Sequence, residues 1–343
     1  MTPRHTLRLA VLLLAVLHAL ILFAGFIAPY DFSSQNRDLT FAPPALIHFV
    51  DTHGRIHRRP FVYGLRFDAL DPTGYKIDPS QIDPLEFLVA GAPYKIAGLF
   101  PATRHLFGVR APSRVFLMGT DAYGRDQFSR FLYGGQISLL AGLLAAAVSL
   151  TIAVAVGALA GYYRGWIDEI LMRTGELFLA LPWLYLLFAV RAVLPLHIAG
   201  WQVFLLLVAV MGLLGWARPA RLIRGVVLSA KERNFVLAAR GFGASDFYLL
   251  GRHILPQASG VILTQLALLI PQYVLAEVTL SFLGLGVSEP TPSWGSLLSS
   301  LQQYYVLSSY WWMFLPAVLL VPVFLLYYAA ANALQERFRS VQL

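Results

Sequence analysis

The most informative segment of the chain reads Asn234-Phe-Val-Leu-Ala-Ala-Arg-Gly-Phe-Gly-Ala-Ser-Asp-Phe-Tyr-Leu-Leu-Gly-Arg-His-Ile-Leu-Pro256. It is basic and amphipathic, and glycines interrupt it. Long apolar segments precede and follow it along the chain. Neighbouring helices are usually joined by short connections, so an ordered polar segment of this length needs a physical reason. The most direct reason is a partner that docks on it.

The composition indicates a protein whose surroundings are largely lipid. The chain is 58% hydrophobic and only 13% charged, and its mean hydropathy is +0.65. Soluble globular domains carry about 25% charged residues. The sequence contains no cysteine, which excludes thiol catalysis and disulfide bonds. We therefore expect an integral membrane protein with a modest soluble part.

Six apolar segments meet or approach the length of a membrane-spanning helix, which is about 20 residues. The first is too long and too uniformly apolar for the core of a signal peptide, so we expect residues 1–29 to be a retained anchor. The predicted fold class is an all-α integral membrane protein with six transmembrane helices. The predicted spans are Leu9–Ala28, Ile137–Gly161, Leu171–Leu194, Trp201–Ala217, Val261–Leu283 and Met313–Ala333.

Positive charge is unevenly distributed among the segments outside these spans. Lys and Arg cluster before the first span, after the second, in residues 218–257 and near the C-terminus, whereas none occurs from Gly260 to Glu336. Positively charged loops stay in the cytosol, so we expect both termini and residues 218–257 to be cytosolic. Residues 30–115 are also basic, but long loops cross the membrane regardless of charge. The net charge of +8 then reflects topology, and we expect no nucleic acid partner.

Residues 30–115 differ in composition from the rest of the chain. They are rich in Pro, Gly, Asp and aromatic residues, with short alternating pieces such as Phe61–Phe67. This pattern is typical of short strands and turns, so we expect a small β-rich extracytoplasmic insertion after the first helix. The pair His53 and His57 alone does not indicate a metal site, and we expect no bound metal.

Motifs that carry bond chemistry are absent from the sequence. It contains no G-x-x-x-x-G-K-[ST] phosphate-binding loop, no H-E-x-x-H and no G-x-S-x-G. The segment Gly119–Asp126 has two aspartates around a glycine but lacks the other ligands of a calcium loop. We interpret residues 116–136 as a capped turn followed by an interfacial helix over Arg125–Tyr133. The chain is therefore predicted to be no enzyme and to bind no cofactor itself.

Within the opening stretch, the apolar spacing predicts two short helices. Glycine at 243 favours a turn, because glycine adopts the left-handed conformation at little cost. A second helix is predicted over Ser245–Leu255, with a Ser/Asp cap and an end at Pro256. Such a pair could enter a groove on another protein or rest on lipid headgroups, and the pattern alone does not decide between these. The residues at i, i+3, i+4 and i+7 on the first helix are Phe235, Ala238, Ala239 and Phe242.

The order Ala238-Ala239-x-x-x-Gly243, then Ile254-Leu255-Pro256, resembles the coupling-loop signature of bacterial ABC importer permeases. One position departs from the family pattern. Leu237 stands where the family has a glutamate that contacts the ATPase, and Glu232 lies close by in the sequence.

Three further parts of the chain resemble the oligopeptide/dipeptide branch of this family. Leu117–Asp126 with Ser129–Ser138 resembles the start of the second span, and Ala160–Glu169 resembles the first cytosolic turn. Leu280–Gly286 with Pro290–Gly295 resembles the last outer loop. The insertion is longer than in most of the family, and the C-terminal segment lacks the family's usual Gly-Asp pair.

The resemblance implies the type I importer permease fold, with residues 137–333 as the membrane domain, 218–257 as a cytosolic coupling loop and 334–343 as a cytosolic tail. It implies a non-catalytic subunit of the bacterial inner membrane that forms half of a translocation pathway for peptides or peptide-like solutes. The implied partners are a second homologous permease subunit, two ATPase subunits that bind the ATP, an extracytoplasmic substrate-binding protein and membrane lipid. The residues implied to couple to the ATPase are Phe235, Ala238, Ala239, Arg240, Phe242, Gly243, Asp246, Ile254 and Pro256.

Two residues of the fifth predicted span are candidates for the translocation pathway or its gate. Glu277 is ionisable within an apolar span, which is by default a functional hypothesis, and Ser281 follows one turn later. Glu277 could line an outer gate or meet the amino terminus of a peptide. A structural hydrogen bond to a neighbouring helix is the alternative.

Two other interpretations differ in transport mechanism or in substrate. An ion-coupled secondary transporter would show inverted-repeat hydropathy and carboxylates at mid-membrane, whereas this sequence shows no visible repeat. Near relatives within the same family carry nickel chelates or oligosaccharides, and the sequence does not identify the substrate.

Overall fold

The computed structural model describes residues 3–342 except 72, 97, 181, 183, 184, 187 and 190–199. The chain divides into two compact units. Unit 1 consists of Met1–Leu14, Leu139–Glu277 and Val323–Leu343, and unit 2 consists of Ala15–Ser138 and Val278–Pro322.

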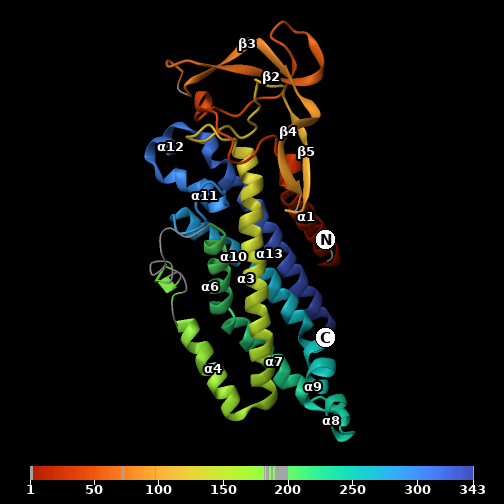
Figure 1. Cartoon of the computed structure of the whole chain (residues 1–343). Coiled ribbons are helices and arrows are strands. Elements are labelled where there is room, and N and C mark those ends of the chain that lie inside the picture. Colours follow the sequence, from red (N-terminus) through yellow and green to blue (C-terminus); the bar gives the residue numbers. More distant parts are fainter. Residues whose placement is uncertain are drawn as a thin grey trace. The chain divides into compact units, whose positions relative to one another are not determined.

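Most of the described residues are helical (Figure 1). A π-helix, η2 (Leu249–Ile254), and a 3-10 helix, η3 (Leu255–Ala258), precede the long helix α10. The α-helices are α1 (Pro3–Leu22), α2 (Ala24–Ile27), α3 (Gln127–Tyr163), α4 (Gly165–Ala180), α6 (Gly200–Leu214), α7 (Ala217–Lys231), α8 (Asn234–Gly241), α9 (Asp246–Tyr248), α10 (Ser259–Phe282), α11 (Trp294–Ser299), α12 (Tyr304–Ser309) and α13 (Leu315–Gln342).

Among the described residues, four helical stretches are long and apolar enough to cross a membrane. A fifth arises if α6 and α7, which meet at a 42° bend, count as one span. The predicted span Leu171–Leu194 begins within α4 and continues into residues outside the described part of the chain. The predicted number of six is therefore neither reached nor contradicted. The four stretches are His5–Leu22, Gln127–Tyr163, Asp246–Phe282 and Trp311–Phe338.

The helix predicted over Arg125–Tyr133 is present from Gln127, but it does not end at Tyr133, because α3 continues to Tyr163. Gly134 and Gly135 do not interrupt α3, because other segments pack directly against their backbone. A Cβ atom on Gly134 would lie only 3.1 Å from the carbonyl carbon of Ser293. A position without a side chain allows this close approach, and the helix continues through it.

Helix α7 occupies the first part of the segment 218–257, where the sequence predicted a loop. Its charged residues Arg218 and Arg221 are exposed, whereas one set of apolar residues, which recurs at helical spacing, is buried. An amphipathic helix therefore follows α6, beyond the end of the predicted span Trp201–Ala217. The buried residues of α7 are Ala217, Pro219, Ala220, Ile223, Val227 and Ala230.

Two glycines bring α3 into close contact with α7 inside unit 1. A Cβ atom on Gly157 would lie 2.6 Å from the carbonyl oxygen of Ala220, and one on Gly161 would lie 2.8 Å from Cβ of Val227. Small residues four positions apart on one helix allow two helix backbones to approach closely. This contact fixes α7, the helix from which the candidate docking segment emerges.

The last helix also exceeds its prediction. Helix α13 runs to Gln342, whereas the sequence predicted a span that ends at Ala333 and a separate tail over 334–343. Pro322 lies within this helix. Proline is tolerated in membrane helices because neighbouring groups satisfy the freed carbonyl, so it does not mark an end here.

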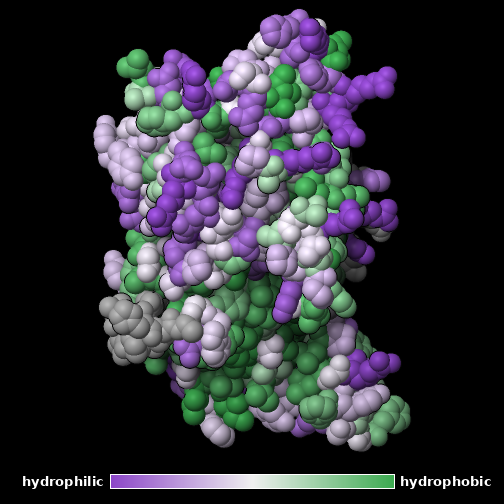
Figure 2. All heavy atoms as spheres, turned by 45° about the horizontal axis from the view of Figure 1, so that its top comes forward, coloured by the Kyte–Doolittle hydropathy of each residue, from purple (hydrophilic) through white to green (hydrophobic). Residues whose placement is uncertain are grey.

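The five strands of the described residues all lie in unit 2, between His48 and Gly108. The predicted alternating segment Phe61–Phe67 is part of β2. Figure 2 shows hydrophilic residues gathered over the strands and hydrophobic residues over the long helices. Strands β1 (His48–Val50), β2 (Ile56–Phe67) and β3 (Tyr75–Pro84) form an antiparallel sheet in that order, and β4 (Glu86–Ile96) and β5 (Phe100–Gly108) form a separate antiparallel hairpin.

Candidate functional site

The glycine turn predicted within residues 234–256 is present. Helix α8 ends at Gly241, and Gly243 follows with a φ of +84°, in the left-handed region that favours glycine. Ser245 then caps the next helical piece, because its hydroxyl accepts a hydrogen bond from the backbone N–H of Tyr248 at 3.4 Å. Two short helical pieces therefore meet at an angle that glycine sets.

The apolar residues around this turn face solvent. Phe242 and Phe247 are 92% and 88% exposed, whereas Val236 is buried and holds α8 to the rest of unit 1. Exposed apolar clusters of this kind mark sites of contact with a protein or a membrane. We call Phe235, Leu237, Phe242, Phe247 and Tyr248 the apolar patch. Of the predicted coupling residues, Phe235, Ala238, Arg240, Phe242, Gly243, Asp246 and Pro256 are exposed, Ala239 is half-buried and Ile254 is buried.

Tyr162, at the end of α3, connects both helical pieces to a membrane helix. Its hydroxyl donates a hydrogen bond to the carboxylate of Asp246 and accepts one from Nη2 of Arg240 at 2.8 Å. Its carbonyl oxygen accepts a hydrogen bond from Nζ of Lys231, which lies 4.9 Å from the centroid of the tyrosine ring. One buried residue therefore ties α3 to α7, α8 and α9.

Two ion pairs strengthen this attachment. Arg224 of α7 binds Asp168 of α4 in a bidentate geometry, with both N···O distances at 2.5 Å. Such a pair fixes orientation as well as distance. Nη2 of Arg164 lies 2.5 Å from Oε1 of Glu232, so the glutamate near Leu237 in the sequence is paired within the chain.

The predicted helix end at Pro256 is wrong. After α9 the chain continues as a helix through η2 and η3 into α10. Proline lacks an N–H and its ring clashes with the carbonyl four residues earlier. The wider π-helix before Pro256 and the tighter 3-10 turn around it accommodate that clash, as is common at proline in membrane helices. Residues 234–256 are therefore continuous with α10.

Sequence reasoning missed the groups that anchor the segment, namely Tyr162, Lys231 and the Arg224–Asp168 pair. The only signal was indirect. Ala160–Glu169, which contains Tyr162 and Asp168, resembles the family's first cytosolic turn, but nothing in its spacing connects it to α9.

The two pathway candidates, both on α10, are buried within the chain. Glu277 is completely buried. Ser281 packs against α11, where a Cβ atom on Gly295 would lie 2.6 Å from the Cβ of Ser281. Neither side chain is exposed on the surface of the described chain.

A second polar cluster, in unit 2, joins the segment before α3 to the loop after α10. Nε of Arg125 lies 2.7 Å from Oδ2 of Asp121, and its Nη1 lies 2.6 Å from Oε2 of Glu289. Nη2 of Arg130 lies 2.8 Å from Oε1 of the same glutamate. Both arginines and Asp121 are buried. Removing one partner of a buried ion pair is strongly destabilising, so we assign this cluster a structural role.

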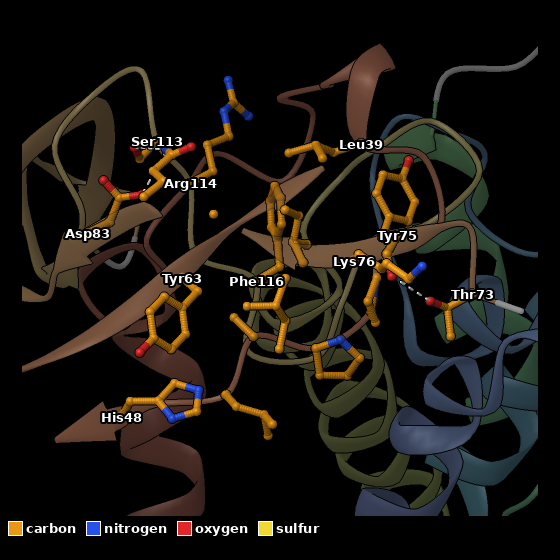
Figure 3. A pocket seen from close by; sticks show the side chains of 18 of the residues that line it. Leu39, His48, Tyr63, Thr73, Tyr75, Lys76, Asp83, Ser113, Arg114 and Phe116 are labelled. Atoms are coloured by element: carbon orange, nitrogen blue, oxygen red, sulfur yellow. Dashed lines mark hydrogen bonds between the residues drawn. The ribbon is translucent and has the colours of Figure 1, made fainter. Parts of the chain in front are cut away.

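Unit 2 also contains a cavity of about 590 Å³ beside the β1-β2-β3 sheet (Figure 3). Tyr63 and His48 lie together at one side of it, with ring centroids 5.0 Å apart. The charged residues that the structure places in its lining already have partners, so the cavity does not define the chemistry of a ligand. These partners are Asp68 for Lys76, Thr73 for Asp71, Gln81 for Asp83 and Ser34 for Arg114.

Relatives of this chain are membrane subunits of transport systems. It is 40% identical over 184 residues to the dipeptide transport system permease protein DppC of Bacillus subtilis (strain 168), a match that covers 54% of this chain and 56% of that protein. It is 38% identical over 200 residues to the oligopeptide transport system permease protein OppC of the same organism, covering 58% of this chain and 64% of that protein. It is 38% identical over 188 residues to the glutathione transport system permease protein GsiD of Pectobacterium atrosepticum, covering 55% of this chain and 60% of that protein.

A solved structure of the MetNI methionine ABC transporter in inward-facing conformations is similar with a TM-score of 0.48 and 17% sequence identity, over 61% of this chain and 95% of that one. A likeness of this size carries no further conclusion.

The segment that matches the family contains all of residues 234–256. The match to the family spans residues 153–340, which include Tyr162, the apolar patch and α10. The chain spans little more than half of the length of the curated relatives that it matches. Because the family match covers more than half of the chain, the chain belongs to the family of binding-protein-dependent transport system inner membrane components.

Proposed function

We propose that this chain is a transmembrane permease subunit of a binding-protein-dependent ABC importer, and that the apolar patch docks in a groove of a partner ATPase. The observation that carries the proposal is the exposure of Phe242 and Phe247 on a segment that Tyr162 anchors to α3. A surface of large apolar side chains on a rigidly held segment suits a permanent protein partner.

The alternative role for the segment is an interfacial helix that rests on lipid headgroups. Such a helix directs its cations toward lipid phosphates. Here Arg240 of α8 is directed at Tyr162 instead, as is Lys231 at the adjoining end of α7. Because these two cations bind Tyr162 and not lipid phosphates, we favour a protein groove over a membrane surface as the docking partner.

The anchors give the proposal a mechanism. The partner ATPases bind ATP and move relative to each other, and the apolar patch moves with the groove that holds it. Tyr162 and the Arg224–Asp168 pair transmit this displacement to α3, α7 and α4 as one body. The chain itself performs no bond chemistry and binds no cofactor.

The relatives described above are permease proteins of dipeptide, oligopeptide and glutathione transport systems, and this supports a peptide-like substrate for the present chain. We propose peptides or peptide-like solutes, delivered by an extracytoplasmic binding protein to a pathway that this chain forms with a second permease subunit. Residues 137–333 form the membrane domain, 30–115 an extracytoplasmic insertion, and both termini lie in the cytosol. The gate role of Glu277 and Ser281 stays a prediction.

Site-specific photocrosslinking tests the docking site. A photoreactive phenylalanine analogue replaces Phe242 in the chain, which is expressed with its neighbouring permease and ATPases. Irradiation should capture the ATPase, identified by mass spectrometry. The same analogue at Tyr304, which is exposed on α12, serves as the control and should not capture it. Capture of lipid at Phe242, with no ATPase, would overturn the proposal.

The absence of a phosphate-binding loop from the sequence gives a second expectation. Purified without its partners, the chain should neither bind nor hydrolyse ATP. Equilibrium binding of a fluorescent ATP analogue measures this. Saturable binding to the isolated chain would contradict the proposal that only the partner ATPases bind ATP.

A further inference from the structure

The β4–β5 hairpin runs back along the helix through which the chain first crosses the membrane. Nδ1 of His105 lies 2.6 Å from the carbonyl oxygen of Ala28, and its Nε2 lies 3.0 Å from that of Ala92. Nearer the hairpin tip, the ring of Tyr94 packs on Gly25, where an added Cβ atom would lie only 2.3 Å from the ring. From Ala92 to Tyr94, β4 approaches its tip and passes from the level of Ala28 to the level of Gly25.

That direction leads into the membrane. Helix α2 continues α1, because Phe23 N–H donates to the Ala19 carbonyl at 2.9 Å and Ile27 N–H donates to the Phe23 carbonyl at 3.1 Å. The apolar span of α1 ends at Leu22. Figure 1 shows the hairpin beside this end of α1.

Simple strand geometry places the tip beside the last turn of this span. Ile96 pairs with Phe100 at the end of the hairpin, two residues beyond Tyr94. Two strand residues advance about 7 Å, which equals between four and five residues of helix, or about 1.5 Å each. The tip therefore reaches the level of Ile21, within the apolar span and not above it.

The side chains of the tip suit lipid. Leu99 and Phe100 are 73% and 67% exposed, although water-facing hairpin tips are usually polar. Between Phe87 and Gly108 the sequence has no acidic residue, and its Lys and Arg residues are Lys95 and Arg104. Both are exposed, but Lys95 pairs with Pro101 next to the tip, whereas Arg104 pairs with Ala90, five strand residues farther from it. The long side chain of Lys95 can extend from the tip toward the phosphates of the lipid headgroups.

We propose that the tip of the β4–β5 hairpin, with Leu99 and Phe100, inserts into the membrane leaflet from which α1 emerges, and that Lys95 contacts the headgroup phosphates. The occupant of the exposed tip is lipid, because the tip continues the lipid-facing surface of α1, where Leu20, Leu22 and Phe23 are also exposed. The hairpin thereby holds the insertion against the membrane beside the first helix. The inference rests on the membrane position of α1 and goes beyond the proposed import function.

Fluorescence quenching in proteoliposomes tests this. The chain contains no cysteine, so Leu99→Cys can be labelled uniquely with bimane in the reconstituted full chain. Lipids brominated on their acyl chains should quench the Leu99→Cys label several-fold more than a label at Leu70→Cys, while aqueous iodide should show the opposite order. Leu70, in the β2–β3 turn, is 93% exposed and is the matched control.

Two outcomes would overturn the proposal. Iodide quenching at Leu99→Cys equal to that at Leu70→Cys would show that the tip lies in water. Loss of quenching by both reagents when the neighbouring permease is added would show that protein covers the tip. Phe100→Cys, labelled in the same way, gives a second reading at the tip. None of these outcomes depends on ATP or on transport.

Discussion

Tyr162 is the residue on which the docking segment depends most. Its hydroxyl serves Asp246 and Arg240 together, and both partners are charged. Hydrogen bonds to charged groups contribute about 1.5–3 kcal/mol. Losing this hydroxyl leaves the aromatic ring in place but frees the start of α9 and the end of α8.

We therefore expect Tyr162→Phe to loosen the segment without unfolding the membrane helices. A loss of about 1.4 kcal/mol corresponds to a roughly tenfold increase in local opening. Hydrogen–deuterium exchange measures this as faster exchange over residues 234–248, with α3 unchanged. Tyr163→Phe is the control, because Tyr163 is half-exposed and its ring, which the variant keeps, packs against the ring of Tyr162. Equal exchange in the two variants would show that the hydroxyl does not anchor the segment.

Asp126, at the start of α3, predicts a pH dependence of stability. Burial raises the pKa of its carboxyl from 3.8 to about 6, although hydrogen bonds from Ser129 oppose the shift. The folded chain thus holds this proton more tightly than the unfolded chain. The resulting stability is fully present below pH 3.8 and is lost as pH rises through 6. A shift of this size corresponds to about 3 kcal/mol.

Asp126→Asn should remove this dependence. The amide oxygen can still accept the hydrogen bonds that Ser129 donates to Oδ2 of Asp126, at 2.8 Å from its N–H and 2.5 Å from its hydroxyl, but the side chain carries no charge. Thermal unfolding in detergent should give a higher Tm at pH 8 for the variant than for the parent chain, and a smaller difference between pH 5 and pH 8. Asp38→Asn, at an exposed position, should behave like the parent. An unchanged pH profile in Asp126→Asn would show that another group titrates.

The turn between α8 and α9 is determined by the local sequence. Gly243 alone sets it, since its φ of +84° is costly for other residues. No other atom lies within 4 Å of the position of an added Cβ on Gly243. The constraint is therefore conformational and not steric.

We expect Gly243→Val to disrupt the angle between α8 and α9, because a β-branched residue at positive φ is strongly disfavoured. Gly243→Asn should be milder, since asparagine tolerates the left-handed region. Gly241→Val is the matched control, because Gly241 is equally open but has helical backbone. The expected result for Gly243→Val is loss of copurifying ATPase and of uptake, with normal amounts of the chain in the membrane. Normal uptake in Gly243→Val would show that the turn angle has no part in coupling.

The same region also has features that the sequence alone did not predict. Glycine and Ser/Asp capping rules located the turn at Gly243, because those rules act over a few residues. The continuation through Pro256 depends on a local change of helix type, and the continuation of α3 through Gly134 depends on packing against Ser293. The anchor between Tyr162 and Asp246 joins residues that no periodicity connects. Tertiary contacts of this kind cannot be predicted from a local sequence pattern.

At the scale of the whole chain, the prediction that remains to be tested is the side of the membrane on which each segment lies. The positive-inside rule assigns residues 218–257 to the cytosol and 30–115 to the opposite side. The assignment matters for both proposals, since an ATPase can reach the apolar patch only from the cytosol, whereas lipid is available to the hairpin from either leaflet.

Cysteine labelling decides the orientation, because any introduced cysteine is unique in this chain. In intact spheroplasts a membrane-impermeant maleimide should label Leu70→Cys, whereas Phe247→Cys should react only after permeabilisation. Both positions are highly exposed, so a failure to react reports the membrane barrier and not burial. The chain is expressed without the ATPases, so that no partner covers Phe247, and labelling in denaturant confirms that each thiol is free. The reverse pattern would remove the docking proposal, because the apolar patch would then face away from any source of ATP. It would leave the hairpin proposal intact, since the tip and the end of α1 would still share one leaflet.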